Sequence, residues 1–382
     1  MTRDWKSVAG AWLGVGTSPS ALLVGAGLAA QHAGPIPLVS MFGAMALIFI
    51  LIWFQGHLGL QPPLGDGGNL TQVAPRYFNP VMQKLLGALI AFGMTGWFGL
   101  NIGFGAAAFG ALVGQPQWLG VLVMGVPILV LSLRGLHGWN ALASLTTMCV
   151  LVLIALIVSR YGATAMPLTL NVAPPLQTLS DVALMMGFVS VFMVRAPDFT
   201  ARLGTRRDLA IVGLLLCTPL TITILAGANL QQGTGSADLV SVLAGTSGLA
   251  IGNLLITLAS IAPTFTTLYS GAPALRAATG IDETRGMFGM GMIGIVLAIW
   301  RIDQMMLPWL SVLAATLPPI LIPLAVESVR RRAGHAPRQV SVWLWLSGAV
   351  VAVALTLAKH PLASLAGLSA SGIATGVWHW RK

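Results

Sequence analysis

Charged residues are scarce in this 382-residue chain: they make up 8% of it, and only ten residues are Asp or Glu. Soluble domains carry about 25% charged residues. With 56% hydrophobic residues and a mean hydropathy of +0.85, the chain has more apolar surface than a soluble fold could bury. These values exclude an ordinary soluble protein and favour one that lies in a lipid bilayer.

Cysteine and catalytic motifs are scarce as well. Cys149 and Cys217 both fall inside apolar stretches, which predicts buried thiols rather than a disulfide or a metal site. The six histidines are scattered, and the sequence contains neither H-E-x-x-H nor G-x-S-x-G. A membrane-embedded enzyme is therefore the weakest hypothesis. We predict no catalytic residues, and no cofactor other than a coupling ion, either sodium or a proton.

Long apolar stretches dominate the chain instead. A helix needs about 20 residues to cross a hydrocarbon core of about 30 Å. On this basis we predict twelve spans, at 9–30, 36–56, 83–113, 117–134, 139–159, 180–200, 208–228, 248–274, 286–302, 305–325, 341–357 and 362–378. The longest polar gap, 57–82, predicts a connection with a short amphipathic piece. The predicted fold class is an all-α polytopic membrane protein that uses residues 1–382 as one domain.

Basic residues predict the orientation, because short loops rich in Lys and Arg stay on the cytoplasmic side. Only Arg160, Arg301 and Lys359 fall in one set of alternate gaps. Sixteen fall at the ends or in the other set: Arg3, Lys6, Arg76, Lys84, Arg134, Arg202, Arg206, Arg207, Arg276, Arg285, Arg330, Arg331, Arg332, Arg338, Arg381 and Lys382. This alternation predicts a multi-pass protein of the cytoplasmic membrane with both termini in the cytoplasm. The net charge of +10 therefore reflects topology and not a nucleic-acid-binding face.

The first span contains a candidate helix break at Gly14-Val15-Gly16-Thr17-Ser18-Pro19-Ser20. Proline removes a backbone donor, while glycines and hydroxyls loosen the helix at the same place. Within a bilayer, freed backbone groups are tolerated only where they are buried in protein or line a wet cavity. We therefore predict that Gly16, Thr17 and Ser18 face a bound solute. The alternative is a proline kink that its own Ser and Thr satisfy.

The sixth span contains a second candidate break, near Gly187, followed by Phe188 and Phe192. Interrupted spans at corresponding positions of two halves are typical of inverted-repeat transporters, whose solute site lies near the bilayer midplane. Spans one and six are such a pair, since each opens one half of a molecule with five spans per half.

The third span presents a ring and an amide on one helix face. Trp97 and Asn101 are four residues apart, and Met94 lies one turn earlier. An indole can stack on a flat ring, and an amide can both donate and accept hydrogen bonds. This pairing predicts a site for a small planar nitrogen heterocycle, with Phe188 or Phe192 completing a sandwich. The alternative is that Trp97 only packs and Asn101 bonds a neighbouring helix.

The eighth span carries Ser260, Thr264 and Thr267 at i, i+4 and i+7, interrupted by Pro263. Hydroxyls, and carbonyls freed by proline, are hard oxygen ligands suited to a small cation. The alternative is that each hydroxyl bonds back to its own helix.

Few charges fall within the spans. Arginine at a span centre costs about 2.5–3.5 kcal/mol, so Arg195 and Asp198 near the end of span six predict an ion pair that acts as a gate or a structural latch. Asp181, Asp303 and Glu327 lie at span ends, where we expect them to cap helices or face water.

Several short motifs follow one another in an order that resembles the nucleobase:cation symporter-1 family of cytosine permease and its hydantoin, allantoin, uracil and purine relatives. They are Gly-Trp-Phe-Gly at 96–99, Pro-Asp-Phe-Thr-x-Arg at 197–202, Leu-Tyr-Ser-Gly at 268–271, Thr-Gly at 279–280 and Leu-Pro-Pro at 317–319. The resemblance covers nearly the whole chain. It implies a LeuT-like 5+5 inverted repeat, 9–159 and 180–325, with two extra helices at 341–378. It also implies uptake of a nucleobase-like solute by alternating access, coupled to a cation.

The resemblance also assigns roles to single residues. Trp97 matches the stacking tryptophan, Asn101 the polar residue that contacts substrate in hydantoin-type members, and Phe188 the ring of span six. Backbone carbonyls from Val15 to Ser18 and at Ala259 match the sodium ligands.

Two departures leave the substrate and the coupling open. Met94 stands where cytosine permeases have a glutamine, so hydantoins, purines, other pyrimidines and vitamin precursors are all candidates. Ala262 and Pro263 stand where the family has the hydroxyls of its sodium site, unless Ser260 and Thr264 substitute. Proton coupling and an uncoupled facilitator are the alternatives.

Overall fold

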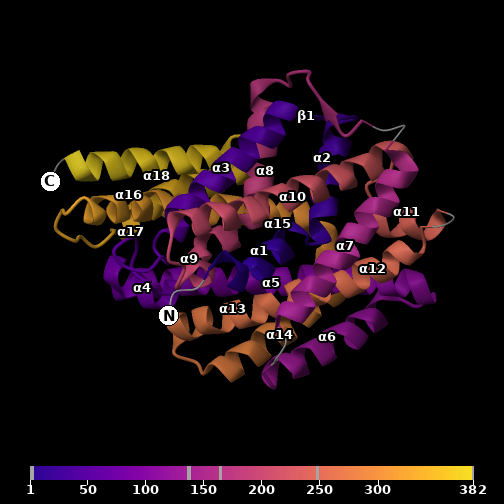
Figure 1. Ribbon diagram of the computed structural model, residues 1–382, viewed down its shortest axis with the longest axis horizontal. Coiled ribbons are helices and arrows are strands. Elements are labelled where there is room, and N and C mark those ends of the chain that lie inside the picture. Colours follow the sequence, from indigo (N-terminus) through magenta and orange to yellow (C-terminus); the bar gives the residue numbers. More distant parts are fainter. Residues whose placement is uncertain (1–3, 136–138, 163–165, 247–248, 381–382) are drawn as a thin grey trace.

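Helices occupy every predicted span of the computed structural model, which describes residues 4–135, 139–162, 166–246 and 249–380 (Figure 1). Three residues of the predicted cytoplasmic set, Arg3, Arg381 and Lys382, lie outside this described part. Cys149 and Cys217 are free and buried, as predicted.

Eight of the predicted spans are single helices. They are α3 (Leu38–Gly56), α5 (Pro80–Val113), α6 (Gln117–Leu133), α7 (Trp139–Tyr161), α10 (Arg206–Thr234), α14 (Glu283–Ile299), α17 (Val342–Leu357) and α18 (Ala363–Trp380). The other spans are interrupted. They consist of α1 (Ala9–Gly16) and α2 (Ser20–His32); α8 (Pro175–Val194) and α9 (Ala196–Thr200); α12 (Ile251–Ala259) and α13 (Ile261–Thr279); and α15 (Met306–Thr316), the 3-10 turn η3 (Pro318–Ile320) and α16 (Leu321–Arg332).

Smaller elements connect the spans. They are η1 (Trp5–Ser7), α4 (Leu70–Tyr77), α11 (Leu239–Gly245), η2 (Ile302–Met305) and the parallel pair β1 (Ile36–Pro37) and β2 (Leu168–Thr169). Helix α4 is the predicted amphipathic piece. Asn69 and Gln72 form a capping box at its start, and it buries Leu70 and Val73.

Eight segments of the described chain are long and apolar enough to cross a membrane, judged by length and composition. They are the first, second, third, fifth, sixth, seventh, eighth and tenth predicted spans. The remaining four are α6, α14, α17 and α18. The all-α multi-pass class is confirmed, and the count of twelve crossings stays a prediction.

The predicted break in the first span is confirmed. Helix α1 ends at Gly16 and α2 begins at Ser20. Protein groups satisfy the carbonyls exposed there: the Thr17 backbone N–H and hydroxyl both donate to Leu13, and the Thr223 hydroxyl of α10 donates to Gly16 at 3.2 Å. The break is therefore buried in protein, as the bilayer requires.

The predicted break near Gly187 is wrong. Helix α8 runs through Gly187 to Val194 and is interrupted only at Arg195, before Pro197 opens α9. Gly187 serves packing instead, because a Cβ there would lie 2.5 Å from the Leu310 carbonyl oxygen of α15. Glycine permits this close helix crossing, while Pro197, which has no backbone N–H, begins a new helix.

Helix contacts repeat between the two predicted halves. From the first half, α3 packs on α8 and α5 on α14; from the second half, α10 packs on α2 and α13 on α6. Exchanging the halves turns each contact into its counterpart, as an inverted repeat requires. The 34-residue helix α5 also packs along its counterpart α13. The repeat limits 9–159 and 180–325 stay predictions.

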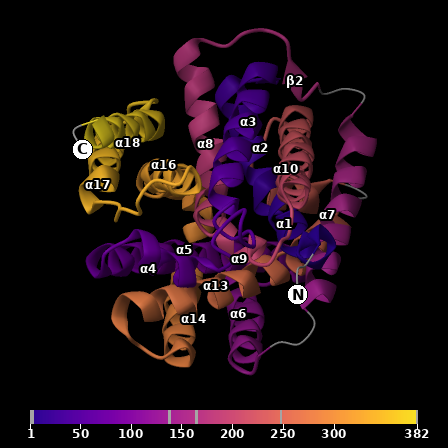
Figure 2. The same ribbon diagram turned by 60° about the vertical axis from the view of Figure 1, so that its left-hand side comes forward.

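The two extra helices pack on the end of the second half, chiefly on α15. Helices α17 and α18 pack on each other and lie at one edge of the bundle beside α16 (Figures 1 and 2).

The crossing of α2 and α10 supplies a stability test. A Cβ added to Gly227 would lie inside the van der Waals distance of the Leu22 carbonyl oxygen. A Cβ added to Gly25 would likewise overlap the Ile224 carbonyl oxygen. We expect Gly227→Ala to lower the free energy of unfolding by about 1–3 kcal/mol or more. This should appear as a lower melting temperature of the purified protein.

The matched control is Gly289→Ala in α14, where no described heavy atom lies within 4 Å of the added Cβ. Alanine favours a helix over glycine by about 0.5–1 kcal/mol, so this variant should melt at the same or a higher temperature. Equal melting temperatures for the two variants would contradict the close crossing.

Candidate solute-binding site

A cavity of about 80 Å³ lies where the first-span break meets α5, α7, α8 and α13. One water needs about 10–15 Å³ on the same measure, so the cavity has room for more than a single water. Its walls are mostly apolar, and the polar side chains that line it are Ser18, Asn101, Thr266 and Thr267.

The structure brings most of the predicted solute-binding residues together at this cavity. Met94, Trp97 and Asn101 line it from α5, Phe188 and Phe192 line it from α8, and Ser18 lines it from the break. These six come from three segments far apart in the sequence.

The aromatic side chains do not form a parallel sandwich. The rings of Trp97 and Phe188 meet edge to face, with centroids 5.3 Å apart and planes at 88°. Phe192 stacks on Phe199 at 4.5 Å and meets Trp12 edge to face. A flat solute that stacks on Trp97 would therefore displace the Phe188 edge or lie beside it.

The amide of Asn101 is buried, with 4% of the residue exposed, and it faces the cavity. It makes no hydrogen bond with any residue in the described part of the chain. Buried polar groups are nearly always paired with protein or water. The alternative that Asn101 bonds a neighbouring helix is therefore not what the structure shows, and the amide is available to a ligand.

Gly16 and Thr17 do not line the cavity. A Cβ on Gly16 would lie 2.7 Å from the Leu216 carbonyl oxygen of α10, so this glycine serves a helix crossing. The Thr17 hydroxyl donates to Leu13 and lies 3.2 Å from the Thr147 hydroxyl of α7. Both residues shape the break without facing the solute space.

Sequence reasoning missed part of the lining. Gly10, Ala11 and Gly14 of α1 and Ala143 of α7 border the cavity. Gly10 and Gly14 are four residues apart, so this face of small side chains was visible in the sequence. Ala143 had no such signal, because only the packing of α7 against α1 brings it to the cavity.

The five predicted sodium ligands do not all line the cavity. Val15 and Ser18 line the cavity, whereas Ala259, Ser260 and Thr264 are fully buried away from it. Ser260 and Thr264 donate to carbonyls of their own helical segment, at 2.9 and 2.5 Å. This arrangement does not present the five residues as one open cation site.

A threonine pair of α7 stands between the two breaks. Pro263 cannot donate to the Ala259 carbonyl four residues earlier, and the Thr146 hydroxyl donates to it instead, at 3.1 Å. Its neighbour Thr147 meets Thr17. Groups of α7 therefore contact both breaks, next to the predicted cation ligands of the first span and at Ala259.

The expectation that Asp181 and Glu327 face water or only cap helices is wrong. Asp181 is 1% exposed, accepts a hydrogen bond from Ser40 at 2.5 Å and pairs with His32 at 2.9 Å. Ser40 and His32 lie on α3 and α2, about 140 residues away in the sequence. The pattern of residues within one span could not predict this cluster, because its members come from three different helices.

Glu327 is likewise fully buried, and pairs with Arg330 and Arg331 at 2.7 and 2.9 Å. It also accepts the Arg338 backbone N–H at 2.7 Å, which ties α16 to the loop that follows. Asp303 is mostly buried as well, and it accepts from Gln117 of α6 at 3.1 Å. These carboxylates hold helices together.

The unpaired amide of Asn101 allows a test of its role in ligand binding. Asn101→Leu should leave the melting temperature of the ligand-free protein unchanged or higher, because it removes a buried group that has no protein partner. Binding of a cavity ligand should weaken by about tenfold or more. Ligand-induced thermal shift measures both effects, and a large loss of ligand-free stability would show that Asn101 is structural.

No protein-family model and no curated protein matches the chain. Among solved structures, it is similar to Mhp1, a nucleobase-cation-symport-1 family transporter, in a closed conformation with bromovinylhydantoin bound. The TM-score is 0.73 at 16% identity, over 98% of this chain and 91% of that one. An inward-facing conformation of Mhp1 gives a TM-score of 0.68 at 16% identity, over 100% and 93%. The predicted resemblance and the LeuT-like fold class are thus confirmed at the level of the fold: the chain has the fold of this transporter along nearly its whole length.

Proposed function

We propose that the protein is a secondary transporter of the cytoplasmic membrane that imports a small planar nitrogen heterocycle by alternating access. The observation that carries the proposal is the cavity beside the first-span break, where Trp97 and the free Asn101 amide lie on one face of α5. An aromatic face next to an unpaired donor and acceptor recognises a flat ring that has N–H and C=O groups on its edge.

The cavity walls support selection by shape. Phe188 and Val191 of α8 and Pro263 of α13 close it with apolar surface, so charged solutes would lose hydration without compensation. Thr266 and Thr267 add hydroxyls on the wall. An uncharged heterocycle of nucleobase or hydantoin size suits these groups, and the hydantoin bound in a structure of the same fold supports this class.

The fold supports the transport mode. Structures of Mhp1 with this fold are described in closed and inward-facing conformations. In this chain the cavity is bordered by both halves, α1 and α8 opening one half each and α5 and α13 lying at equivalent positions. A solute held there can face either side of the membrane when the two sets of helices rock against each other. The alternating basic residues support cytoplasmic termini.

Removing the indole tests the site directly. Trp97→Ala should weaken binding by about 1–3 kcal/mol, roughly 5- to 150-fold, because a stacked ring loses its partner. Trp97→Phe, which keeps an aromatic face, should retain a large part of the affinity. Uptake into proteoliposomes and thermal shift against a panel of hydantoins, purines and pyrimidines measure the effect. Unchanged uptake by the alanine variant would remove Trp97 from the site.

Coupling is tested by imposing gradients on the same proteoliposomes. Because Thr146 occupies the Ala259 carbonyl and Ser260 and Thr264 lie off the cavity, we expect a proton gradient to drive accumulation and a sodium gradient to have no effect. The buried Asp181–His32 pair is a candidate proton acceptor. Accumulation driven by sodium would instead support the predicted sodium ligands. Equilibration without accumulation under either gradient would identify an uncoupled facilitator.

A further inference from the structure

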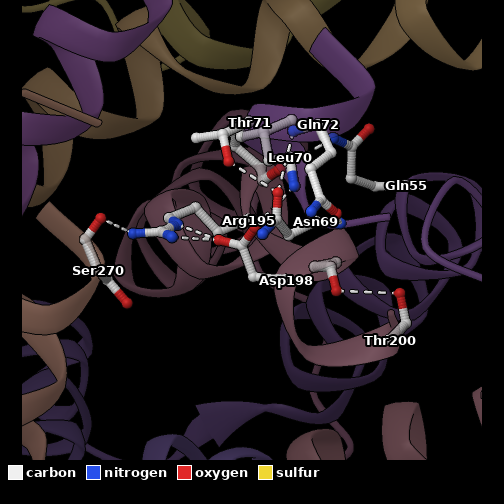
Figure 3. A network of polar contacts seen from close by, with 11 residues as sticks. Gln55, Asn69, Leu70, Thr71, Gln72, Arg195, Asp198, Thr200 and Ser270 are labelled. Atoms are coloured by element: carbon white, nitrogen blue, oxygen red, sulfur yellow. Dashed lines mark hydrogen bonds and ion pairs between the residues drawn. The ribbon is translucent and has the colours of Figure 1, made fainter. Parts of the chain in front are cut away.

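One charged side chain bridges two cavity-lining helices just beyond the cavity. Helices α8 and α13 contribute Phe192 and Thr267 to the lining. Three residues later on each helix, the guanidinium of Arg195 donates a hydrogen bond to the Ser270 carbonyl (Figure 3). The two walls of the cavity are thus tied together one helical turn from its end.

Other groups fix the guanidinium in this position. Its Nε and Nη2 atoms pair with the Asp198 carboxylate of α9, while Nη1 points to Ser270 (Figure 3). Asp198 also accepts the Leu70 backbone N–H, at the start of α4, at 2.7 Å. The side chains of Arg195 and Asp198 are only 8% and 12% exposed. A buried arginine with a paired carboxylate is held firmly, and it can be released only by breaking several charge-assisted bonds.

A second hollow lies on the far side of the same guanidinium. It is about 40 Å³ in volume, and Arg195 borders it together with Leu70 of α4, Gly87 of α5 and Ala274 of α13. Arg195 does not border the solute cavity. The hollow lies toward the start of α5 and the end of α13, near the helix ends that carry the predicted cytoplasmic residues Arg76 (α4), Lys84 (α5) and Arg276 (α13).

Aromatic rings close the same end of the cavity. Phe192 stacks on Phe199 with centroids 4.5 Å apart, and Trp12 of α1 meets both rings edge to face. This cluster joins α1 to α8 and α9, as Arg195 joins α8 to α13. The aromatic cluster and Arg195 together separate the solute cavity from the hollow.

We propose that Arg195 is the cytoplasmic gate of the solute path, and that the path runs from the Trp97 cavity past the guanidinium into the hollow between α4, α5 and α13. This inference rests on the proposed transport function. Opening requires the Arg195–Ser270 bond, which Asp198 holds in place, to break as α8 and α13 separate. A purely structural latch would stabilise the fold without controlling access to the cavity.

The test uses a reporter cysteine at Thr267, in a chain whose native Cys149 and Cys217 are replaced by alanine. Labelling by a membrane-impermeant maleimide is measured from each side of sealed vesicles of known orientation. We expect slow labelling from the cytoplasmic side in the parent. Arg195→Ala should raise that rate by about tenfold or more, because losing a charge-assisted bond shifts the equilibrium toward open states. Labelling from the other side should not rise.

Arg207→Ala is the matched control, since Arg207 is exposed at the start of α10 and belongs to the same predicted cytoplasmic set. It should leave the labelling rate unchanged. Should Arg195→Ala not fold, Asp198→Asn serves instead. It keeps an oxygen for the Leu70 N–H but removes the ion pair, and it should also raise the rate.

Folded Arg195→Ala or Asp198→Asn protein that labels as slowly as the parent would overturn the gate. Labelling that rises equally with Arg207→Ala would overturn it too, because the effect would then be general. The readout needs no solute, so a failed heterocycle screen would count against the proposed function and leave the gate result standing.

Discussion

The breaks in α1–α2 and α12–α13 free backbone carbonyls of their helices, and the need to satisfy these groups shapes the site. In a bilayer each freed carbonyl or N–H must find a partner inside the protein. The partners here are hydroxyls from other helices: Thr223 of α10 for Gly16 and Thr146 of α7 for Ala259. These bonds hold α10 against the first break and α7, which lines the cavity, against the second.

Close helix crossings complete that frame. Gly25 and Gly227 allow α2 and α10 to approach at backbone distance, and Gly187 does the same for α8 and α15. Packing of this kind drives helix association where lipid removes the hydrophobic difference between helix and surroundings. The cavity remains open because α5 contributes the Trp97 indole and the Asn101 amide to its wall, while α1 contributes only small residues.

Three buried charged residues join segments of the chain. Asp181 connects α2, α3 and α8, Glu327 connects α16 to its following loop, and Arg195 connects α8, α9 and α13. Each is buried and paired, which is the condition for tolerating charge in this environment. Removing one partner of a buried ion pair destabilises a protein strongly, because the other charge is left buried and unpaired. Such pairs therefore suit contacts that form and break as a unit.

Composition and helical periodicity were enough to predict the membrane class, the helical stretches, the break at Gly16–Ser20 and the shared face of Trp97 and Asn101. Each of these follows from local composition or from helical periodicity within one segment. Contacts between distant helices determine four other features: α8 continues through Gly187, Asp181 pairs with His32, Thr146 donates to the Ala259 carbonyl, and Arg195 donates to the Ser270 carbonyl. Those outcomes depend on partners roughly 75 to 150 residues away, and a pattern within one helix carries no information about which neighbour will approach it.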